Sequence, residues 1–398
     1  MEENSKKLSE EEKIKEEQIL IDKNKTKYEL KNLIKDNIFI GDMKNGDSKI
    51  EVVIKKITGI SDDKEEAKHA LRELSILSFV KHKGIIKLLD IIIPEQENLD
   101  YLYLVTEKKP SDLKVIIKSP NVDNLDDNKN KNFIGFIIYQ ILSALKYLHS
   151  RKIMHRDIKP SNILIDSDSH TFIFDFELAR SFKDIKPDNG KLITKEIGTL
   201  FYAAPEMLGN EENGGYNEKV DIWAVGCIMA ELFIGKCPIF GFDKNSEIKN
   251  ENKKDKWNWF EQLKKIFSIL GRPEDKIIKK VFRNQEVCDN ILDHIKEKDY
   301  PIKNFNEIFP KIKDENALDL LKKLFEFNYK NRISAEEALK HPFFEYLQFN
   351  DKDRKKIEFG NKYELVFNYF KEEENNKDKS EVTIINYKIT KVDRKSVV

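Results

Sequence analysis

One segment of ten residues, 155–164 (HRDIKPSNIL), constrains this chain more than any other part of its sequence. It follows a strongly apolar helical pattern that ends near His149, and it leads into a strand-like stretch at 162–165. A second short apolar stretch, 171–174, comes soon afterwards. The sequence therefore predicts a polar loop between a buried helix and two short strands.

The polar residues in and after this loop have the types and the spacing that phosphoryl transfer uses. Asp157 can accept the proton of a substrate hydroxyl, and Lys159 can neutralise charge on the transferred phosphate. Asn162 offers an amide oxygen to Mg²⁺, and the carboxylate of Asp175 can bridge Mg²⁺ to the phosphates of a nucleotide. The pattern thus indicates catalytic roles for Asp157, Lys159 and Asn162, and metal ligation by Asn162 and Asp175.

The part of the chain before this loop predicts a small lobe rich in β-strands. Its apolar, β-branched segments are separated by turn-prone residues, which is typical of antiparallel strands, and residues 63–80 between them show helical spacing. The predicted strands are 28–34, 37–43, 50–57, 85–93 and 101–105. Residues 1–26 are rich in Glu and Lys, and they predict a solvated helix or a disordered arm.

The chain from Ser111 onward predicts mainly helices. Residues 220–233 are almost wholly apolar, so this helix is expected to be buried on most sides, whereas residues 243–256 are polar and predict a solvated insertion. The predicted helices are 133–149, 220–233, 257–270, 316–325 and 334–339. Together these elements predict an α+β fold with a strand-rich lobe and a larger helical lobe.

The charges of the chain are balanced, with 71 Lys and Arg residues against 71 Asp and Glu residues. This balance argues against a nucleic acid or a membrane surface as a partner, and the charged terminal segments mix both signs. No uninterrupted apolar run is long enough to span a bilayer, and the three cysteines are too few and scattered for a disulfide framework. We therefore expect an intracellular protein, of the cytoplasm or the nucleus.

Further motifs, in a matching order and at matching spacings, make the chain resemble eukaryotic protein kinases. Residues 52–55 (VVIK) are similar to the strand motif whose lysine, here Lys55, holds the phosphates of ATP, and Glu73 matches the helix glutamate that pairs with it. Residues 204–206 (APE) resemble the end of the activation segment, and Arg332 lies where kinases place the arginine that pairs with this glutamate. The resemblance also implies ATP and Mg²⁺ as cofactors, bound with the help of Lys55, Glu73 and Asp175.

The resemblance implies a bilobal protein kinase fold, with an antiparallel sheet in the N-lobe and a mainly helical C-lobe. It places the kinase domain at residues 27–345, divided into an N-lobe at 27–107 and a C-lobe at 108–345. Residues 1–26 are then a charged N-terminal extension, and residues 346–398 are a charged C-terminal tail.

Within the kinases, the chain is most similar to the group that contains MAP kinases and cyclin-dependent kinases. The stretches DYLYLVTEKKPSDLKVIIKS and YQILSALKYLHS carry this resemblance. It implies that Thr106 is the gatekeeper residue, whose small side chain leaves a pocket open behind the adenine. It also implies that the hinge is Glu107, Lys108 and Lys109, whose backbone groups meet the adenine.

A regulatory site is implied by Thr194, which precedes the APE motif at the spacing of the activating phosphothreonine in this group. A phosphate there can dock on basic residues that include Arg156 and so order the loop, which implies an upstream activating kinase besides a protein substrate. The MAP kinase pattern Thr-x-Tyr is Thr194-Lys195-Glu196 here, so an acidic residue replaces the tyrosine. The alternative is that Thr194 is an ordinary exposed threonine.

The chain departs from the kinase pattern around the nucleotide phosphates. There is no glycine between residues 28 and 40, so the Gly-rich loop is missing, and Leu33, Lys35 and Ile38 lie near its positions. Glycines there let backbone amides approach the phosphates, and side chains crowd that approach. Glu177 replaces the glycine of the DFG motif and adds a carboxylate near the metal.

The sequence leaves two functional hypotheses open. The first is a MAP kinase-like protein serine/threonine kinase, because the six catalytic and nucleotide-site residues are present and Thr199 matches the threonine of this class. The second is a pseudokinase that acts as a scaffold or an allosteric partner, because the glycines are missing and Glu177 is present. Ala203 replaces the arginine before APE, so proline-directed specificity stays open.

Overall fold

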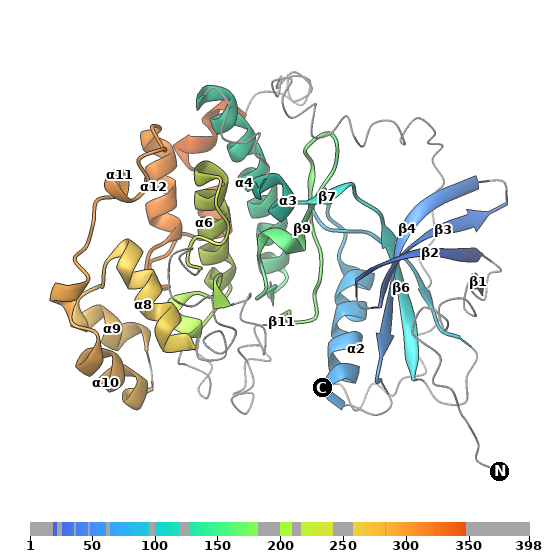
Figure 1. Cartoon of the computed structure of the whole chain (residues 1–398), viewed down its shortest axis with the longest axis horizontal. Helices are drawn as coiled ribbons and strands as arrows, with labels where there is room; N and C mark the ends of the chain where they lie inside the picture. The colour runs from blue at the N-terminus through green and yellow to red at the C-terminus, as the bar shows by residue number, and fades with distance from the viewer. Residues whose placement is uncertain are drawn as a thin grey trace, which may run out of the picture. The chain divides into compact units, whose positions relative to one another are not determined.

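The computed structural model describes residues 19–21, 26–35, 37–46, 48–60, 64–94, 100–118, 127–181, 200–208, 216–241, 258–282 and 284–347. These residues belong to two compact units, whose elements are labelled in Figure 1. The first unit takes its described residues from Met1–Lys81 and Ile86–Lys108, and the second takes them from His82–Ile85 and Lys109–Glu374.

The first unit is built on one antiparallel sheet of six strands, in the order β1-β2-β3-β4-β6-β5. The strands are β1 (Ile19–Ile21), β2 (Lys27–Lys35), β3 (Ile38–Asn45), β4 (Ser48–Thr58), β5 (Leu88–Ile92) and β6 (Tyr101–Glu107). Strands β2 to β6 confirm the five strands that the sequence predicts. The antiparallel pairing of β2 with β3 and of β3 with β4 confirms their predicted arrangement.

Strand β1 shows that the expectation of a solvated helix or a disordered arm over residues 1–26 is wrong for this segment. Its three residues pair with the start of β2, with Ile19 opposite Glu29 and Ile21 opposite Lys27. The run Ile19-Leu20-Ile21 is apolar and mostly β-branched, so it suits an added edge strand. The surrounding Glu and Lys residues hid this short strand from the sequence pattern.

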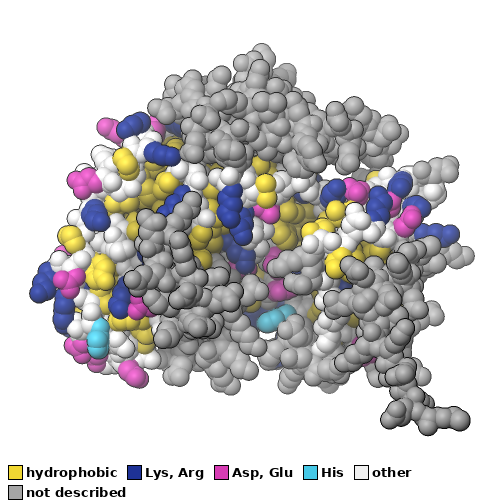
Figure 2. Space-filling model, viewed as in Figure 1, with side chains coloured by type: hydrophobic (Ala, Val, Ile, Leu, Met, Phe, Trp, Pro, Cys, Tyr) yellow, Lys and Arg dark blue, Asp and Glu magenta, His cyan; other side chains and the backbone are white. Residues whose placement is uncertain are grey.

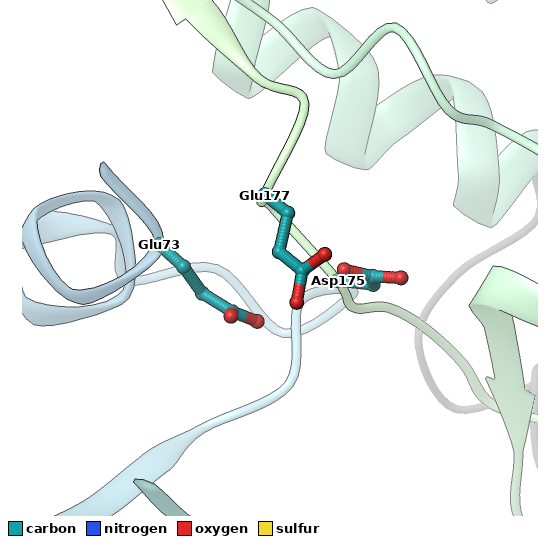
Figure 3. A group of neighbouring side chains, drawn as sticks. All are labelled: Glu73, Asp175 and Glu177. Atoms are coloured by element: carbon teal, nitrogen blue, oxygen red, sulfur yellow. The ribbon is translucent and has the colours of Figure 1, made fainter. Parts of the chain in front are cut away.

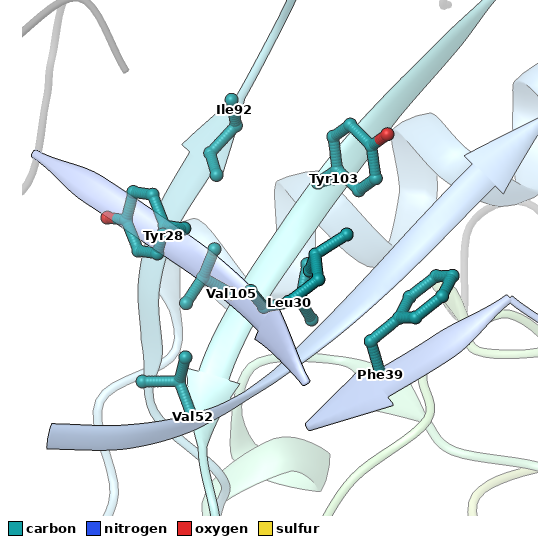
Figure 4. Close-up of a cluster of buried hydrophobic side chains, with 8 residues drawn as sticks. Tyr28, Leu30, Phe39, Val52, Ile92, Tyr103 and Val105 are labelled. Carbon is teal, nitrogen blue, oxygen red and sulfur yellow. The ribbon is translucent and has the colours of Figure 1, made fainter. Parts of the chain in front are cut away.

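One face of the sheet buries a cluster of apolar side chains that come from several strands (Figure 4). Side chains alternate between the two faces of a strand, so Val52 and Ile54 of β4 are fully buried in the cluster while Lys55 lies on the opposite face. The hydroxyl of Tyr28 donates a 2.7 Å hydrogen bond to Asp90, which satisfies two buried polar groups. The other members are Leu30, Phe39, Ile92, Tyr103 and Val105.

Helix α2 (Lys64–Phe79) confirms the helix predicted at 63–80. Its buried apolar residues Ala70, Leu74 and Leu77 recur at helical spacing, which gives the helix one apolar face. Glu73 is buried among them, at 4% exposure. A charged side chain at such a position needs a partner, and its partner is described with the site below.

The second unit is mainly helical, as predicted, and α6 (Lys219–Ile234) is its most buried helix. Every residue from Val220 to Leu232 is buried, and the helix ends at Gly235, whose left-handed backbone (φ 71°) favours glycine. The other helices are α3 (Leu113–Lys118), α4 (Asp127–Ser150), α8 (Trp259–Leu270), α9 (Asp275–Val281), α10 (Gln285–His294), α11 (Phe305–Ile308), α12 (Glu315–Leu324) and α13 (Ala335–Ala338).

Short strands and 3₁₀ turns connect the helices of the second unit. The strands are β7 (Ser111–Asp112), β8 (Ile153–Met154), β9 (Ile163–Ile165), β10 (Thr171–Ile173) and β11 (Arg180–Ser181), in sheets ordered β10-β9-β7 and β11-β8. The 3₁₀ helices are η2 (Pro160–Asn162), η4 (Pro205–Met207), η5 (Glu297–Asp299) and η6 (Pro342–Leu347). Strands β9 and β10 confirm the two strands predicted around the polar loop.

Helix α4 contains a stretch, Lys131–Ser150, that is long and apolar enough to cross a membrane by length and composition. Polar residues such as Gln140 and Lys146 interrupt this stretch, so it is not the uninterrupted apolar run whose absence the sequence predicts. Of the most apolar window in this stretch, 61% is buried inside the protein, and α4 packs against α6 and α13. This packing gives the apolar composition of α4 a role in the core of the second unit.

The described surface carries both signs of charge. In the view of Figure 2, blue Lys and Arg side chains and magenta Asp and Glu side chains are interspersed. Many of them form ion pairs, such as Lys44 with Glu29 at 2.6 Å and Lys276 with Glu274 at 2.6 Å. The balanced composition is thus reflected in local pairing on this surface.

Candidate active site

The polar loop after α4 is anchored by one buried carboxylate, Asp221, at the start of α6. It accepts hydrogen bonds from the backbone N–H groups of His155 at 2.9 Å and Arg156 at 2.8 Å, and from Nε2 of His149 at 2.9 Å. Burial by itself raises the pKa of Asp221, but the contacts with His149 and His155 hold it below its usual value. Asp221 is therefore an ionised anchor that fixes the backbone of the loop.

Sequence reasoning gave Asp221 no anchoring role. The signal was present, because Asp221 is a carboxylate within a helix whose neighbouring residues are apolar. A buried charge of this kind needs donors, but the sequence does not say which backbone groups supply them.

His155 is fully buried and links the loop to the segment after β10. Its Nδ1 accepts a 3.3 Å hydrogen bond from the backbone N–H of Asp157, so Nε2 carries the proton and donates to the carbonyl of Phe174 at 3.0 Å. The ring of His155 also packs against Phe176, with 4.9 Å between the ring centroids. The segments that carry Asp157 and Asp175 are therefore tied to each other.

The structure brings the three predicted catalytic side chains together around the carboxylate of Asp157. Lys159 Nζ donates to Oδ2 of Asp157 at 2.7 Å, and Asn162 Nδ2 donates to the same oxygen at 2.8 Å. Asn162 also donates to the backbone carbonyl of Asp157 at 2.9 Å. Both side-chain bonds use Oδ2, so Oδ1 is the oxygen that can meet a substrate hydroxyl.

The predicted metal ligands have oxygen atoms that suit Mg²⁺. Oδ1 of Asp175 is buried and has no hydrogen-bond partner among the described residues, which is costly for a carboxylate unless a cation binds it. Asn162 uses its amide nitrogen for Asp157, so its amide oxygen is the atom that can act as a ligand. Because Mg²⁺ prefers oxygen ligands, the side chains of Asn162 and Asp175 fit this ion.

Glu177 adds a second carboxylate next to Asp175. Figure 3 draws Asp175 and Glu177 on the segment after β10, and Glu73 on α2. A carboxylate oxygen of Glu177 lies within 4.8 Å of one of Asp175. The residue in the position of the DFG glycine thus places negative charge beside a predicted metal ligand.

The ion pair between Lys55 and Glu73, implied by the kinase resemblance, is present in the first unit. Nζ of Lys55 on β4 donates to Oε2 of Glu73 on α2 at 2.9 Å. The side chain of Glu73 is 5% exposed and that of Lys55 is 25% exposed. Lys55 is therefore partly exposed beside a buried partner, and its contact with nucleotide phosphates remains a prediction.

The predicted gatekeeper and hinge residues lie at the end of β6 and just beyond it. Thr106 and Glu107 are the last two residues of β6 in the first unit. Lys108 pairs with Glu51 in the same unit. Lys109 belongs to the second unit, and its Nζ lies 3.9 Å from the ring centroid of Phe172. The contact of these residues with adenine remains a prediction.

The β2–β3 hairpin lies in the sequence where kinases carry the Gly-rich loop. Strand β2 ends at Lys35 and β3 begins at Ile38, and the turn uses Asn37 in a left-handed backbone (φ 62°), which Asn tolerates better than most residues. Leu33 is 46% exposed, and two irregularities in register fall in the second half of β2. The hairpin is thus formed without glycine at its turn.

The segment with the APE motif is tied to the second unit by a buried ion pair. Arg332 donates from Nη1 to Oε1 of Glu206 at 2.6 Å and from Nη2 to Oε2 at 2.9 Å. Both side chains are almost completely buried, at 0% and 1% exposure. The pairing that the kinase resemblance implied is therefore confirmed.

A second buried carboxyl group on α6, Glu231, was missed by sequence reasoning. The hydroxyl of Tyr202 donates to it at 3.2 Å, and the backbone N–H of Ile239 donates to it at 2.8 Å. Burial raises the pKa of Glu231 to about 8, although both hydrogen bonds oppose the shift. Ala203, which takes the place of the kinase arginine, is buried next to Tyr202.

Some predicted sites lie outside the described residues. These are Thr194, Lys195, Glu196, Thr199, the side chain of Lys35, the insertion at 243–256 and the tail beyond Leu347. The predicted phosphorylation of Thr194 therefore stays a prediction.

The protein kinase domain family matches residues 40–344 of the chain. This range covers more than half of the 398 residues and includes the VVIK, HRD and APE motifs. The chain therefore belongs to the protein kinase family, and the bilobal α+β fold class predicted from the sequence is confirmed.

Similar curated proteins are MAP kinases. The chain is 36% identical over 297 residues to mitogen-activated protein kinase spm1 of Cytospora mali, which covers 74% of this chain and 64% of the relative. It is 36% identical over 301 residues to mitogen-activated protein kinase 13 of Arabidopsis thaliana (75% and 74%). It is 34% identical over 310 residues to mitogen-activated protein kinase 14 of Xenopus laevis (77% and 75%).

These relatives place the chain with the MAP kinases, as its hinge region and helices predicted. The matched region spans about 64% of the length of the first fungal relatives. The relatives are named as kinases, so they give no support to the pseudokinase alternative.

Proposed function

We propose that this chain is a MAP kinase-like protein kinase that transfers the γ-phosphoryl group of ATP to serine and threonine hydroxyls of proteins. The observation that carries the proposal is the arrangement around Asp157, where Lys159 and Asn162 hold one carboxylate oxygen and leave the other for a hydroxyl. When bound, Mg·ATP supplies the phosphoryl group and the metal charge that offsets the phosphates.

Residues of the chain can accept the proton of the substrate hydroxyl and can position the hydroxyl oxygen and the transferred phosphoryl group. Oδ1 of Asp157 accepts a hydrogen bond from the substrate hydroxyl and orients its oxygen. As the new O–P bond forms and the bond to ADP breaks, the hydroxyl proton passes to Asp157. Lys159, held 2.7 Å from Oδ2, is close enough to neutralise charge on the transferred group.

The remaining site residues would hold the nucleotide and its metal. Asn162 and Asp175 would bind Mg²⁺ through oxygen atoms, and Lys55, oriented by Glu73, would bind phosphate oxygens. The backbone of the hinge at 106–109 would meet the adenine. These are the roles that the sequence predicts, and they suit the side chains, because oxygen atoms bind Mg²⁺ and a lysine binds phosphate.

Serine and threonine specificity and the protein partners are also proposed. Thr199 has the residue type of serine/threonine kinases, and the relatives are named mitogen-activated protein kinases. By analogy we expect a protein substrate, and an upstream kinase that phosphorylates Thr194.

Phosphotransfer from radiolabelled ATP to a generic protein substrate tests the proposal. Asp157→Asn keeps the shape of the side chain but removes the proton acceptor, so we expect the rate to fall by about 100- to 10,000-fold. Asp168→Asn, at an exposed position near the loop, is the matched control and should keep the wild-type rate. Equal rates for the wild type and Asp157→Asn would contradict the proposal, and phosphoamino-acid analysis of the product tests the serine and threonine preference.

A further inference from the structure

Asp175 and Glu177 come from one segment of backbone after β10, in which Asp175 has a left-handed conformation (φ 66°). Phe176 between them is fully buried, with its ring packed on His155. The carboxylates of Asp175 and Glu177 (Figure 3) have oxygens within 4.8 Å of each other.

The backbone around Glu177 is held on both sides. His155 donates to the carbonyl of Phe174 at 3.0 Å, the N–H of Ala179 donates to the carbonyl of Phe176 at 3.1 Å, and Arg156 donates to the carbonyl of Leu178 at 3.2 Å. A turn with these bonds does not need glycine. It can instead present a side chain at position 177 in a defined direction.

Two carboxylates this close concentrate negative charge, which favours a cation near both of them. Oδ1 of Asp175 is already buried without a hydrogen-bond partner among the described residues, which is an independent indication that a cation belongs there. Asn162 is a neutral ligand, so Glu177 doubles the negative charge that this part of the second unit offers to a metal ion. The affinity of oxygen ligands for hard divalent cations rises with the number of carboxylates.

We propose that Glu177 raises the metal affinity of the Asp175 site so that the protein binds a divalent cation, Mg²⁺ or Mn²⁺, without nucleotide. The proposal deepens the proposed function and rests on it for the identity of the metal site. It gives the residue at the glycine position of the DFG motif a role in metal affinity.

Titration of the full chain with Mn²⁺, in the absence of nucleotide and followed by calorimetry, tests the proposal. We expect the wild type to bind Mn²⁺ about tenfold or more tightly than Glu177→Gln. Glu177→Asp, which keeps the charge, should bind more tightly than Glu177→Gln, and Asp175→Asn should bind weakest. Glu307→Gln, which removes an exposed carboxylate on α11, is the control and should match the wild type.

Equal Mn²⁺ affinity of the wild type and Glu177→Gln overturns the proposal. If Glu177→Gln melts at a lower temperature than the wild type, the Mn²⁺ affinities of the wild type and Glu177→Asp are compared instead. A charge effect predicts that these two affinities are similar, and a large loss of affinity in Glu177→Asp overturns the proposal. Phosphotransfer at saturating metal separates this proposal from the proposed function. An active chain with equal affinities refutes only the role of Glu177, and an inactive chain with a large affinity difference refutes only the kinase proposal.

Discussion

The polar loop around Asp157 and the β2–β3 hairpin differ in how firmly their structures are fixed. In the loop, Asp221 holds two backbone N–H groups and Asp157 receives two side-chain donors. In the hairpin, Leu33 and Ile34 are exposed and no glycine is present at the turn. The side chains for the metal and the hydroxyl are thus set by buried hydrogen bonds, whereas the part expected over the phosphates departs from the family pattern.

This difference shows where sequence variation is tolerated. Removing Asp157, Asn162 or Asp221 would leave buried donors or acceptors without their partners, which is costly. A change at the exposed Leu33 or Ile34 removes no buried hydrogen bond of this kind. We therefore expect mutations in the loop to have large effects on folding and activity together, and mutations in the hairpin to have small and separable ones.

The largest effect is expected from Asp221→Ala. It removes a buried charge that accepts bonds from His149, His155 and Arg156, so the free energy of unfolding should fall by about 3 to 5 kcal/mol. Urea unfolding measures this change, and phosphotransfer should be lost as well. Asp293→Ala, at an exposed position on α10, should have little effect, and a similar loss in both variants would contradict the anchoring role.

Lys55→Met should affect activity more than stability. Loss of the pair leaves the buried carboxylate of Glu73 without its lysine, so the free energy of unfolding should fall by about 1 to 3 kcal/mol. Phosphotransfer should fall by on the order of 100-fold, because the lysine positions phosphate groups. Lys87→Met, at an exposed site of the first unit, serves as the control. Normal phosphotransfer by Lys55→Met would argue against the predicted role of Lys55.

Glu231 should make stability depend on pH. Its pKa is raised from an ordinary value of 4.5 to about 8 in the folded protein, so the folded state keeps a proton that the unfolded state releases. The stabilising contribution is complete below pH 4.5 and is lost as the pH rises to about 8, with a slope of up to about 1.4 kcal/mol per pH unit.

Urea unfolding between pH 5 and pH 8 measures this dependence. Glu231→Gln keeps a neutral side chain at every pH, so the variant should lose this slope. Glu307→Gln is the exposed control and should keep it. An unchanged slope in Glu231→Gln would show that Glu231 is already ionised in the folded protein.

The smallest effect is expected from Leu33→Gly, which returns a glycine to the hairpin. Closer approach of a backbone N–H to phosphate should lower KM for ATP by roughly 2- to 10-fold, the worth of one hydrogen bond. Glycine in a strand should also cost about 0.5 to 1 kcal/mol in the free energy of unfolding. Leu33→Ala removes the bulk without the added backbone freedom, so an equal change in KM for both variants would mean that bulk alone is responsible.

Much of the site could be predicted from sequence because its residues stand at fixed spacings along the chain. Lys55, Glu73, Asp157, Asn162 and Asp175 were each identified from motifs, and the ion pairs of Lys55 and of Arg332 were expected from them. The sequence did not reveal the residues whose hydrogen-bond partners are backbone groups of distant segments. Asp221 and Glu231 looked like isolated acids in an apolar helix, since their partners come from other segments.

The sequence by itself determined the order of strands and helices, the fold class and the chemical types of the site residues, because these follow from local periodicity and from motif spacing. The tertiary structure decided which oxygen of Asp157 is held, which proton His155 carries and how Asp175 and Glu177 are oriented. It also decided that residues 19–21 form a strand. The physical reason is that hydrogen bonds, burial and charge depend on groups far apart in the chain, which only the folded protein brings within reach of each other.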